Sequence, residues 1–103
     1  MGRLTGKQKR FLRGLGQKLP TLMVVGKAGV TPGTVQAAGE LLSRRELVKI
    51  RLPACPSGGR KAMAEGLAQA LRASCVGVVG RVALLYRPDR SLPKDKRITL
   101  PAP

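Results

Sequence analysis

One short stretch of the sequence, residues 21–32, constrains the fold more than any other. Its first five residues are β-branched or apolar and predict a short strand ending at Val25, before a loop at residues 26–29 that begins and ends with glycine. Thr31 and Pro32 then predict a helix start, because threonine is a good N-cap and proline is favoured at the first helical position. A strand that turns directly into a helix is the beginning of an α/β fold.

Periodic segments on either side of this stretch extend the same pattern. Val48, Ile50 and Leu52 alternate along the chain and predict a half-buried strand that carries Lys49 and Arg51 on its other face. Two helical crossovers followed by a hairpin predict a mixed sheet with parallel crossovers and one antiparallel pair. The expected order is α-β-α-β-α-β-β, at residues 5–18, 21–25, 31–45, 46–52, 60–73, 75–80 and 82–87.

The chain length of 103 residues fits one domain with a modest core. We expect a single compact α/β domain over residues 1–88, with three helices and a four-stranded mixed sheet. After Pro88 the sequence is polar, charged and proline-containing, so residues 89–103 are interpreted as a basic C-terminal tail.

The charge of the chain is strongly one-sided. It has 20 Lys and Arg residues against 5 Asp and Glu residues, a net charge of +15, which predicts nucleic acid as the first choice of partner and an anionic membrane surface as the second. The longest apolar run, residues 22–25, is too short to cross a membrane, and no secretory signal is present. We therefore expect a cytoplasmic monomer that does not bind membranes. A transit peptide is the alternative interpretation of the basic residues 1–18, which fit a folded first helix better.

The composition provides little material for catalysis. The absence of histidine excludes histidine-based acid–base chemistry, and the five acidic residues are scattered singly, without the spacing of a carboxylate dyad or a metal site. Cys55 and Cys75 do not form a CxxC motif and are expected to be free thiols in a reducing cytosol, with a disulfide or redox pair as an unsupported alternative. The sequence thus predicts no enzyme activity, no cofactor, no metal and no small-molecule substrate.

The cations indicate where a polyanion would bind. Gly26 and Gly29 would let a phosphate approach backbone N–H groups, with Lys27 adding charge at the tip of the loop. The plain alternatives are a strand-to-helix turn and an ordinary solvated face. Because Phe11 and Tyr86 are the only aromatic residues, recognition should depend on shape and backbone rather than on stacked bases. The candidate RNA-binding residues are Lys7, Lys9, Arg10, Arg13, Gly26, Lys27, Ala28, Gly29, Lys49, Arg51, Arg81 and Arg87.

Three motifs in this order resemble the CRM domain family, named after chloroplast RNA splicing and ribosome maturation. They are residues 23–31 (MVVGKAGVT), residues 46–50 (ELVKI) and Gly80-Arg81 leading to residues 84–88 (LLYRP). The size and single-domain layout look like the free-standing bacterial YhbY-like members, and the resemblance covers about residues 4–88. The chain departs from the family pattern in residues 53–59, where prolines, glycines and a cysteine replace a more charged connection.

The resemblance implies a fold similar to the C-terminal domain of bacterial translation initiation factor three. It also implies RNA binding, association with precursors of the large ribosomal subunit and a role in ribosome assembly. The family's GxxG loop maps onto residues 26–29, and its basic first helix onto the cations of residues 7–13.

These observations together predict a non-enzymatic protein that binds structured ribosomal RNA during assembly of the large subunit. Two alternatives remain open. One is a ribosome-associated accessory factor held mainly by protein contacts. The other is a general nucleic-acid or anionic-surface binding protein.

Overall fold

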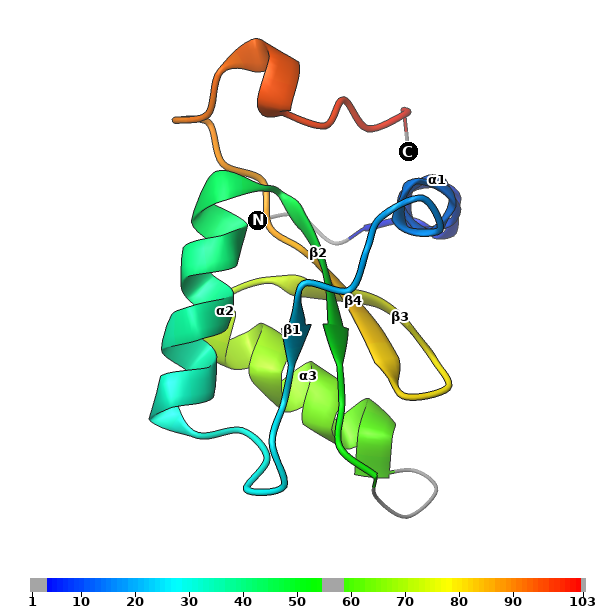
Figure 1. The fold of residues 1–103 in the computed structure, drawn as a ribbon. Helices are drawn as coiled ribbons and strands as arrows, with labels where there is room; N and C mark the ends of the chain where they lie inside the picture. The colour runs from blue at the N-terminus through cyan, green and yellow to red at the C-terminus, as the bar shows by residue number, and fades with distance from the viewer. Residues whose placement is uncertain (1–3, 55–58, 103) are drawn as a thin grey trace.

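The computed structural model describes residues 4–54 and 59–102 and contains the predicted elements in the predicted order (Figure 1). The connection over residues 53–59, where the sequence departs from the family pattern, lies largely outside the described residues, and so does Cys55. The elements are α1 (Gly6–Gly16), β1 (Met23–Val24), α2 (Pro32–Arg44), β2 (Leu47–Arg51), α3 (Gly59–Leu71), β3 (Ser74–Val79), β4 (Val82–Tyr86) and a short 3-10 helix, η1 (Lys94–Lys96).

The four strands form one mixed sheet in the order β1-β2-β4-β3. β1 is parallel to β2, whereas β4 is antiparallel to both β2 and β3. The expectation of one antiparallel pair was therefore wrong, because the last strand of the hairpin inserts between β2 and β3. Four of the five residues of β4 are buried, while β3 is only partly buried, so the more apolar strand takes the central position.

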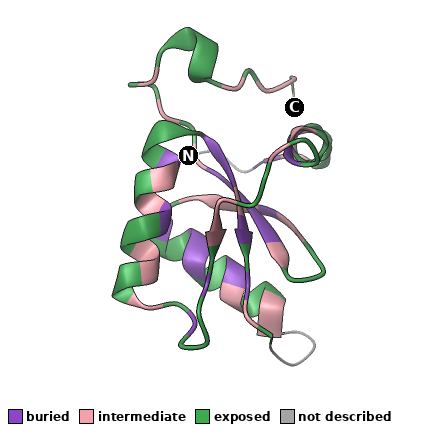
Figure 2. Cartoon of the chain, viewed as in Figure 1, coloured by how far each residue is buried: buried purple, intermediate pink, exposed green. Residues whose placement is uncertain are grey.

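One face of the sheet is covered by α2 and α3, and the main core lies between them and the strands (Figures 1 and 2). The alternation predicted for β2 is confirmed, since Val48, Ile50 and Leu52 all belong to this core. Thr31 caps α2 as expected, its side chain accepting a hydrogen bond from the backbone N–H of Thr34 at 3.2 Å.

The opposite face is covered by α1, which packs over a second cluster that includes Leu12, Leu47 and Tyr86. Thr5 and Gln8 form a capping box at the start of this helix. At its end, a Cβ on Gly16 would lie 2.7 Å from a methyl carbon of Leu84, so glycine allows α1 to approach the sheet closely here. The helix covers only the part of this face near the second cluster and leaves the rest of the face open (Figure 1).

The segment after Pro88, interpreted from sequence as a tail, packs on the domain. Ile98 and Leu100 lie against the second cluster, and the side-chain amide of Gln8 donates a hydrogen bond to the carbonyl of Pro101 at 3.1 Å. Glu46, which is 2% exposed, accepts hydrogen bonds from the backbone N–H groups of Asp89 and Ile98. A buried carboxylate between α2 and β2 therefore fixes this segment at two points, its start at Asp89 and Ile98.

Candidate nucleic-acid interface

The loop between β1 and α2 is a tight, exposed turn. The N–H of Gly29 donates to the carbonyl of Gly26 at 2.9 Å, and Gly29 has a φ of +74°, a conformation that favours glycine. The Thr34 hydroxyl donates to the carbonyl of Gly29 at 3.3 Å and so ties the turn to the first turn of α2. The predicted strand-turn-helix junction is confirmed, and the loop is held from both of its ends.

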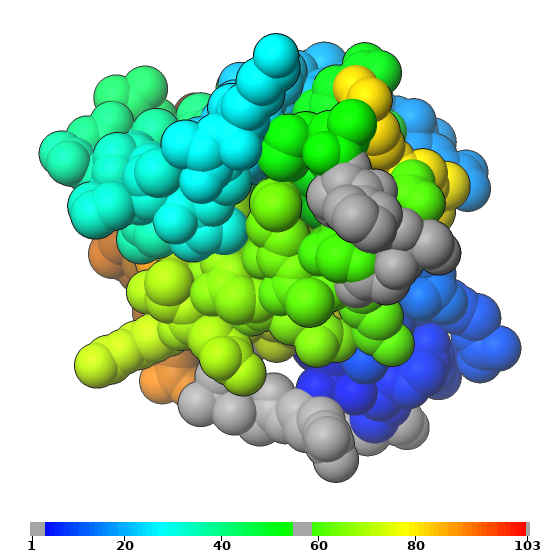
Figure 3. Space-filling model, turned by 90° about the horizontal axis from the view of Figure 1, so that it is seen from below, coloured from blue at the N-terminus to red at the C-terminus, as the bar shows by residue number. Residues whose placement is uncertain are grey.

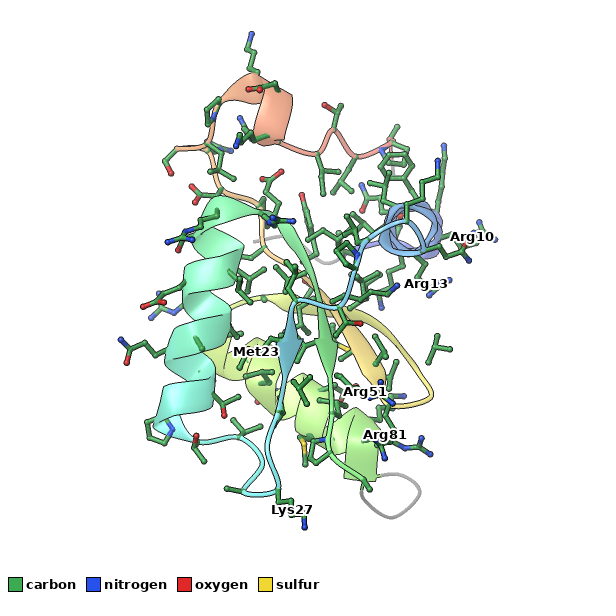
Figure 4. All side chains as sticks on the ribbon, in the orientation of Figure 1. Arg10, Arg13, Met23, Lys27, Arg51 and Arg81 are labelled. Carbon is green, nitrogen blue, oxygen red and sulfur yellow. The ribbon has the colours of Figure 1, made fainter. Side chains whose placement is uncertain are left out.

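The tip of this loop is free to meet a ligand. Lys27 and Ala28 are exposed, and within residues 4–54 and 59–102 their N–H groups make no hydrogen bond. Lys27 points away from the body of the molecule in Figure 4, and the space-filling view in Figure 3 shows the loop standing out from the surface. A cation and unpaired N–H groups at an exposed tip can bind a phosphate oxygen.

The cations of α1 form the second part of the surface. Lys7 and Arg10 are exposed, and Lys9 is half-buried. Arg13 lies across the edge strand β3, where its guanidinium donates to the carbonyl of Val76 at 3.4 Å. Its Cδ would be 3.3 Å from a Cβ on Gly77, so the glycine makes room for this side chain.

The open part of the sheet connects α1 with the loop. Arg51 at the end of β2 and Arg81 in the β3–β4 turn are exposed on this side. In the view of Figure 4, Arg10, Arg13, Arg51, Arg81 and Lys27 follow one another from α1 down to the loop. We call these five residues, together with Lys7 and Lys9, the basic surface.

Two of the predicted binding residues have structural contacts of their own. The ammonium group of Lys49 donates to the carbonyl of Leu19 at 3.1 Å and holds the connection that follows α1. The guanidinium of Arg87 donates to the carbonyls of Leu71 at 3.0 Å and Gly39 at 3.3 Å. Arg87 therefore satisfies a carbonyl at the end of α3, where helical partners are lacking, and ties that end to the middle of α2. The structure does not bring it to the basic surface.

Sequence reasoning missed two cations at the start of α3. Arg60 and Lys61 line a groove of about 600 Å³ along β3, opposite Lys9 and Arg13. The guanidinium of Arg60 also donates to the carbonyl of Gly80 at 2.9 Å. Their adjacency at a helix start was visible in the sequence, but no local pattern could indicate that α3 and α1 would meet around the same strand.

The same groove contains the thiol of Cys75. Burial raises the pKa of this thiol, and the nearby carboxylate of Glu65 raises it further. A raised pKa keeps the sulfur in its neutral form, which is the opposite of what a reactive thiolate requires. In the described part of the chain, no group of three or more His, Cys, Asp and Glu side chains could hold a metal ion. No helix of that part is long and apolar enough to cross a membrane.

Comparison with known proteins identifies the family. Residues 4–87 match the CRS1 / YhbY (CRM) domain. The chain belongs to the CRM domain family. The resemblance predicted from the three sequence motifs is thus confirmed, and the match contains every strand of the sheet and all three α-helices.

Several relatives resemble this CRM domain over their whole length. "Probable RNA-binding protein YqeI" of Bacillus subtilis is 35% identical over 98 residues, covering 95% of this chain and 99% of the relative. A Haemophilus influenzae protein named "RNA-binding protein" is 28% identical, covering 98% of each chain. The solution structure of SAV1595 from Staphylococcus aureus is 33% identical, with a TM-score of 0.82, covering 96% of this chain and all of the other. The predicted fold of one compact domain with three helices and a four-stranded mixed sheet is confirmed.

Proposed function

We propose that this CRM domain binds RNA by contacting its phosphate backbone with the basic surface. The observation that carries the proposal is the exposed loop tip, where Lys27 and two N–H groups that make no hydrogen bond in the described part of the chain lie at the lower end of the row of labelled cations in Figure 4. The net charge of +15 supports a polyanionic partner, and the relatives named RNA-binding proteins support RNA in particular. Phosphate contacts would supply most of the affinity, as is usual for nucleic-acid binding.

The RNA we propose is structured ribosomal RNA, bound in the cytoplasm during assembly of the large subunit. This part of the proposal is supported by the family resemblance. The role is that of a binding protein and not of an enzyme, since the surface offers cations and backbone donors but no acid–base pair.

Charge reversal at the loop tests the binding surface. Lys27→Glu should weaken RNA binding about 10- to 100-fold, because hydrogen bonds to charged groups contribute about 1.5–3 kcal/mol. Arg44→Glu is the matched control, since Arg44 is an exposed cation at the other end of α2, away from the loop. Binding would be measured by fluorescence anisotropy with a fragment of ribosomal RNA, and folding by circular dichroism. Equal affinities of the two folded variants would show that the loop is not part of the binding site.

Cross-linking in cells tests the identity of the RNA. Sequencing of the cross-linked RNA should give positions in large-subunit ribosomal RNA, and nuclease treatment should release the protein from ribosomal particles. Retention after nuclease treatment would instead indicate a factor held by protein contacts. Equal affinity for ribosomal RNA, duplex DNA and anionic lipid vesicles would indicate a general binder of anionic surfaces.

A further inference from the structure

A pocket of about 350 Å³ lies between the end of α1 and the open part of the sheet. Its apolar floor is formed by Val82 and Leu84 from β4, and its rim carries polar side chains from α1, the following connection and β2. The residues that line it include Gln17, Thr21, Lys49, Val79, Val82 and Leu84.

Strand register explains why a pocket forms here. Leu84 is paired with Lys49 on one side and with Gly77 on the other, so the row across the sheet lacks a side chain at β3. Gly16 brings the end of α1 against Leu84, and Arg13 lies over Gly77. The end of α1 and the side chain of Arg13 thus enclose a space above an apolar floor, and this space exists because Gly77 has no side chain to fill it.

The next row of the sheet extends this floor outward. This row crosses all four strands and consists of Val24, Arg51, Val82 and Val79. Val24 is 67% exposed and Val79 is 77% exposed, which makes them the most exposed large apolar residues of the described chain. Exposed valines in a row that also contains an arginine offer apolar contact next to positive charge.

This combination fits one nucleotide better than it fits a helix of paired RNA. A base has flat apolar faces, polar edges and a phosphate on each side. Val82 and Leu84 can contact a face of the base. The side-chain amide of Gln17 and the hydroxyl of Thr21 form no hydrogen bond within residues 4–54 and 59–102, so they are available to the polar edge of the base. Arg13 lines the pocket and Arg51 is paired with Val82 beside it, so both cations are available to the phosphates that flank the base. A volume at the small end of the range for ligand pockets, about 300–1,000 Å³, suits one nucleoside.

We propose that this pocket binds a single unpaired nucleotide of the RNA, an inference that rests on the proposed function. A base inside a duplex is covered by its stacked neighbours and uses its edge for pairing, so only a bulged or looped base enters. The domain therefore prefers RNA in which a helix is interrupted near the site of the loop contact.

Two RNA hairpins that differ by one bulged nucleotide test the proposal. The domain should bind the bulged hairpin about tenfold more tightly, because removing about 55 Å² of apolar surface from water at about 25 cal/mol per Å² gives a tenfold gain. With 2-aminopurine at the bulge, binding should also change the fluorescence of the base as it leaves the helix. Equal affinity for both hairpins with unchanged fluorescence would overturn the proposal that the pocket binds a nucleotide, while leaving the proposed RNA binding intact. Binding to neither hairpin would overturn the proposed function itself.

Uncharged variants separate the pocket from the basic surface. The double variant Val79→Thr with Val82→Thr keeps the β-branched shape and the net charge but makes the floor polar. It should reduce the preference for the bulge to less than about threefold without changing affinity for the paired hairpin. Val30→Thr is the matched control, because Val30 is an exposed valine outside the pocket. Lys27→Glu should weaken binding to both hairpins equally. A double variant that keeps the full preference would contradict the proposal.

Discussion

Replacing Glu46 with alanine should destabilise the domain by detaching the C-terminal segment. One carboxylate oxygen accepts a hydrogen bond from the N–H of Asp89 at 2.6 Å, and the other accepts one from the N–H of Ile98. The guanidinium of Arg97 is 4.0 Å away on a side chain that is 38% exposed, so this long and partly solvated ion pair contributes little to stability. Leaving a buried donor without its acceptor costs about 1–3 kcal/mol, so two donors give a loss of about 2–6 kcal/mol.

The loss of stability in Glu46→Ala has an upper limit, because the C-terminal segment can detach from the domain and expose both N–H groups to water. Ile98 and Leu100 would then lose their contacts with the second cluster. For a domain of this size, a loss of 2 kcal/mol lowers the midpoint of thermal unfolding by about 10 °C. Urea unfolding would measure the free energy, and amide hydrogen exchange at Asp89 and Ile98 would show whether protection is lost locally.

The control for this experiment is Glu40→Ala, which removes an exposed carboxylate from α2 and should change stability by less than about 0.5 kcal/mol. If Glu46→Ala is as stable as this control, or if both amides remain protected in it, then the carboxylate does not hold the segment.

Three further predictions concern the loop, the thiol and the electrostatics. Gly29→Ala should lower the free energy of unfolding by about 1–2 kcal/mol, because residue 29 has a positive φ. Gly14→Ala should raise the free energy of unfolding by about 0.5–1 kcal/mol, because residue 14 lies on α1 with open space around it. Changes of the same sign in urea unfolding of the two variants would contradict this prediction. Because burial raises its pKa above the ordinary value of a thiol, Cys75 should react with iodoacetamide more slowly at pH 8 than a cysteine in a short peptide, and its rate should rise as the pH passes through the raised pKa. Peptide-resolved mass spectrometry would measure both rates, and equal rates would refute the prediction. If the basic surface neutralises about six phosphates, affinity for RNA should fall about a thousandfold between 50 and 200 mM salt. An affinity that does not change with salt would exclude binding through phosphate charges.

Local patterns were sufficient to predict most of the elements. The caps at Thr5 and Thr31 and the alternation of residues 48–52 depend on neighbours within a few positions, and all three are as expected. The position of β4 could not be predicted in this way, because the choice between two neighbours of β2 depends on packing across the whole sheet. The C-terminal segment likewise has no periodicity, and its placement depends on Glu46, which is 52 positions before Ile98.

The binding surface was only partly predictable for the same reason. Composition and spacing indicate cations, but they do not show whether a guanidinium faces solvent or the end of a helix. Arg87 was therefore counted as a binding residue although its guanidinium donates to carbonyls of α2 and α3, and Arg60 was overlooked although it lies beside the edge strand. The pocket depends on Gly16, Gly77 and Leu84 meeting across three elements, which no segment of sequence reveals alone.

Mapping amide chemical-shift changes during titration with RNA tests the central claim most directly, because a chain of 103 residues is well suited to NMR. We expect the largest changes at residues 26–29, at Arg51, at residues 79–82 and along α1. We expect small changes at η1 and at the end of α2, where Arg44 lies. Large changes confined to those two regions, with the loop unaffected, would contradict it.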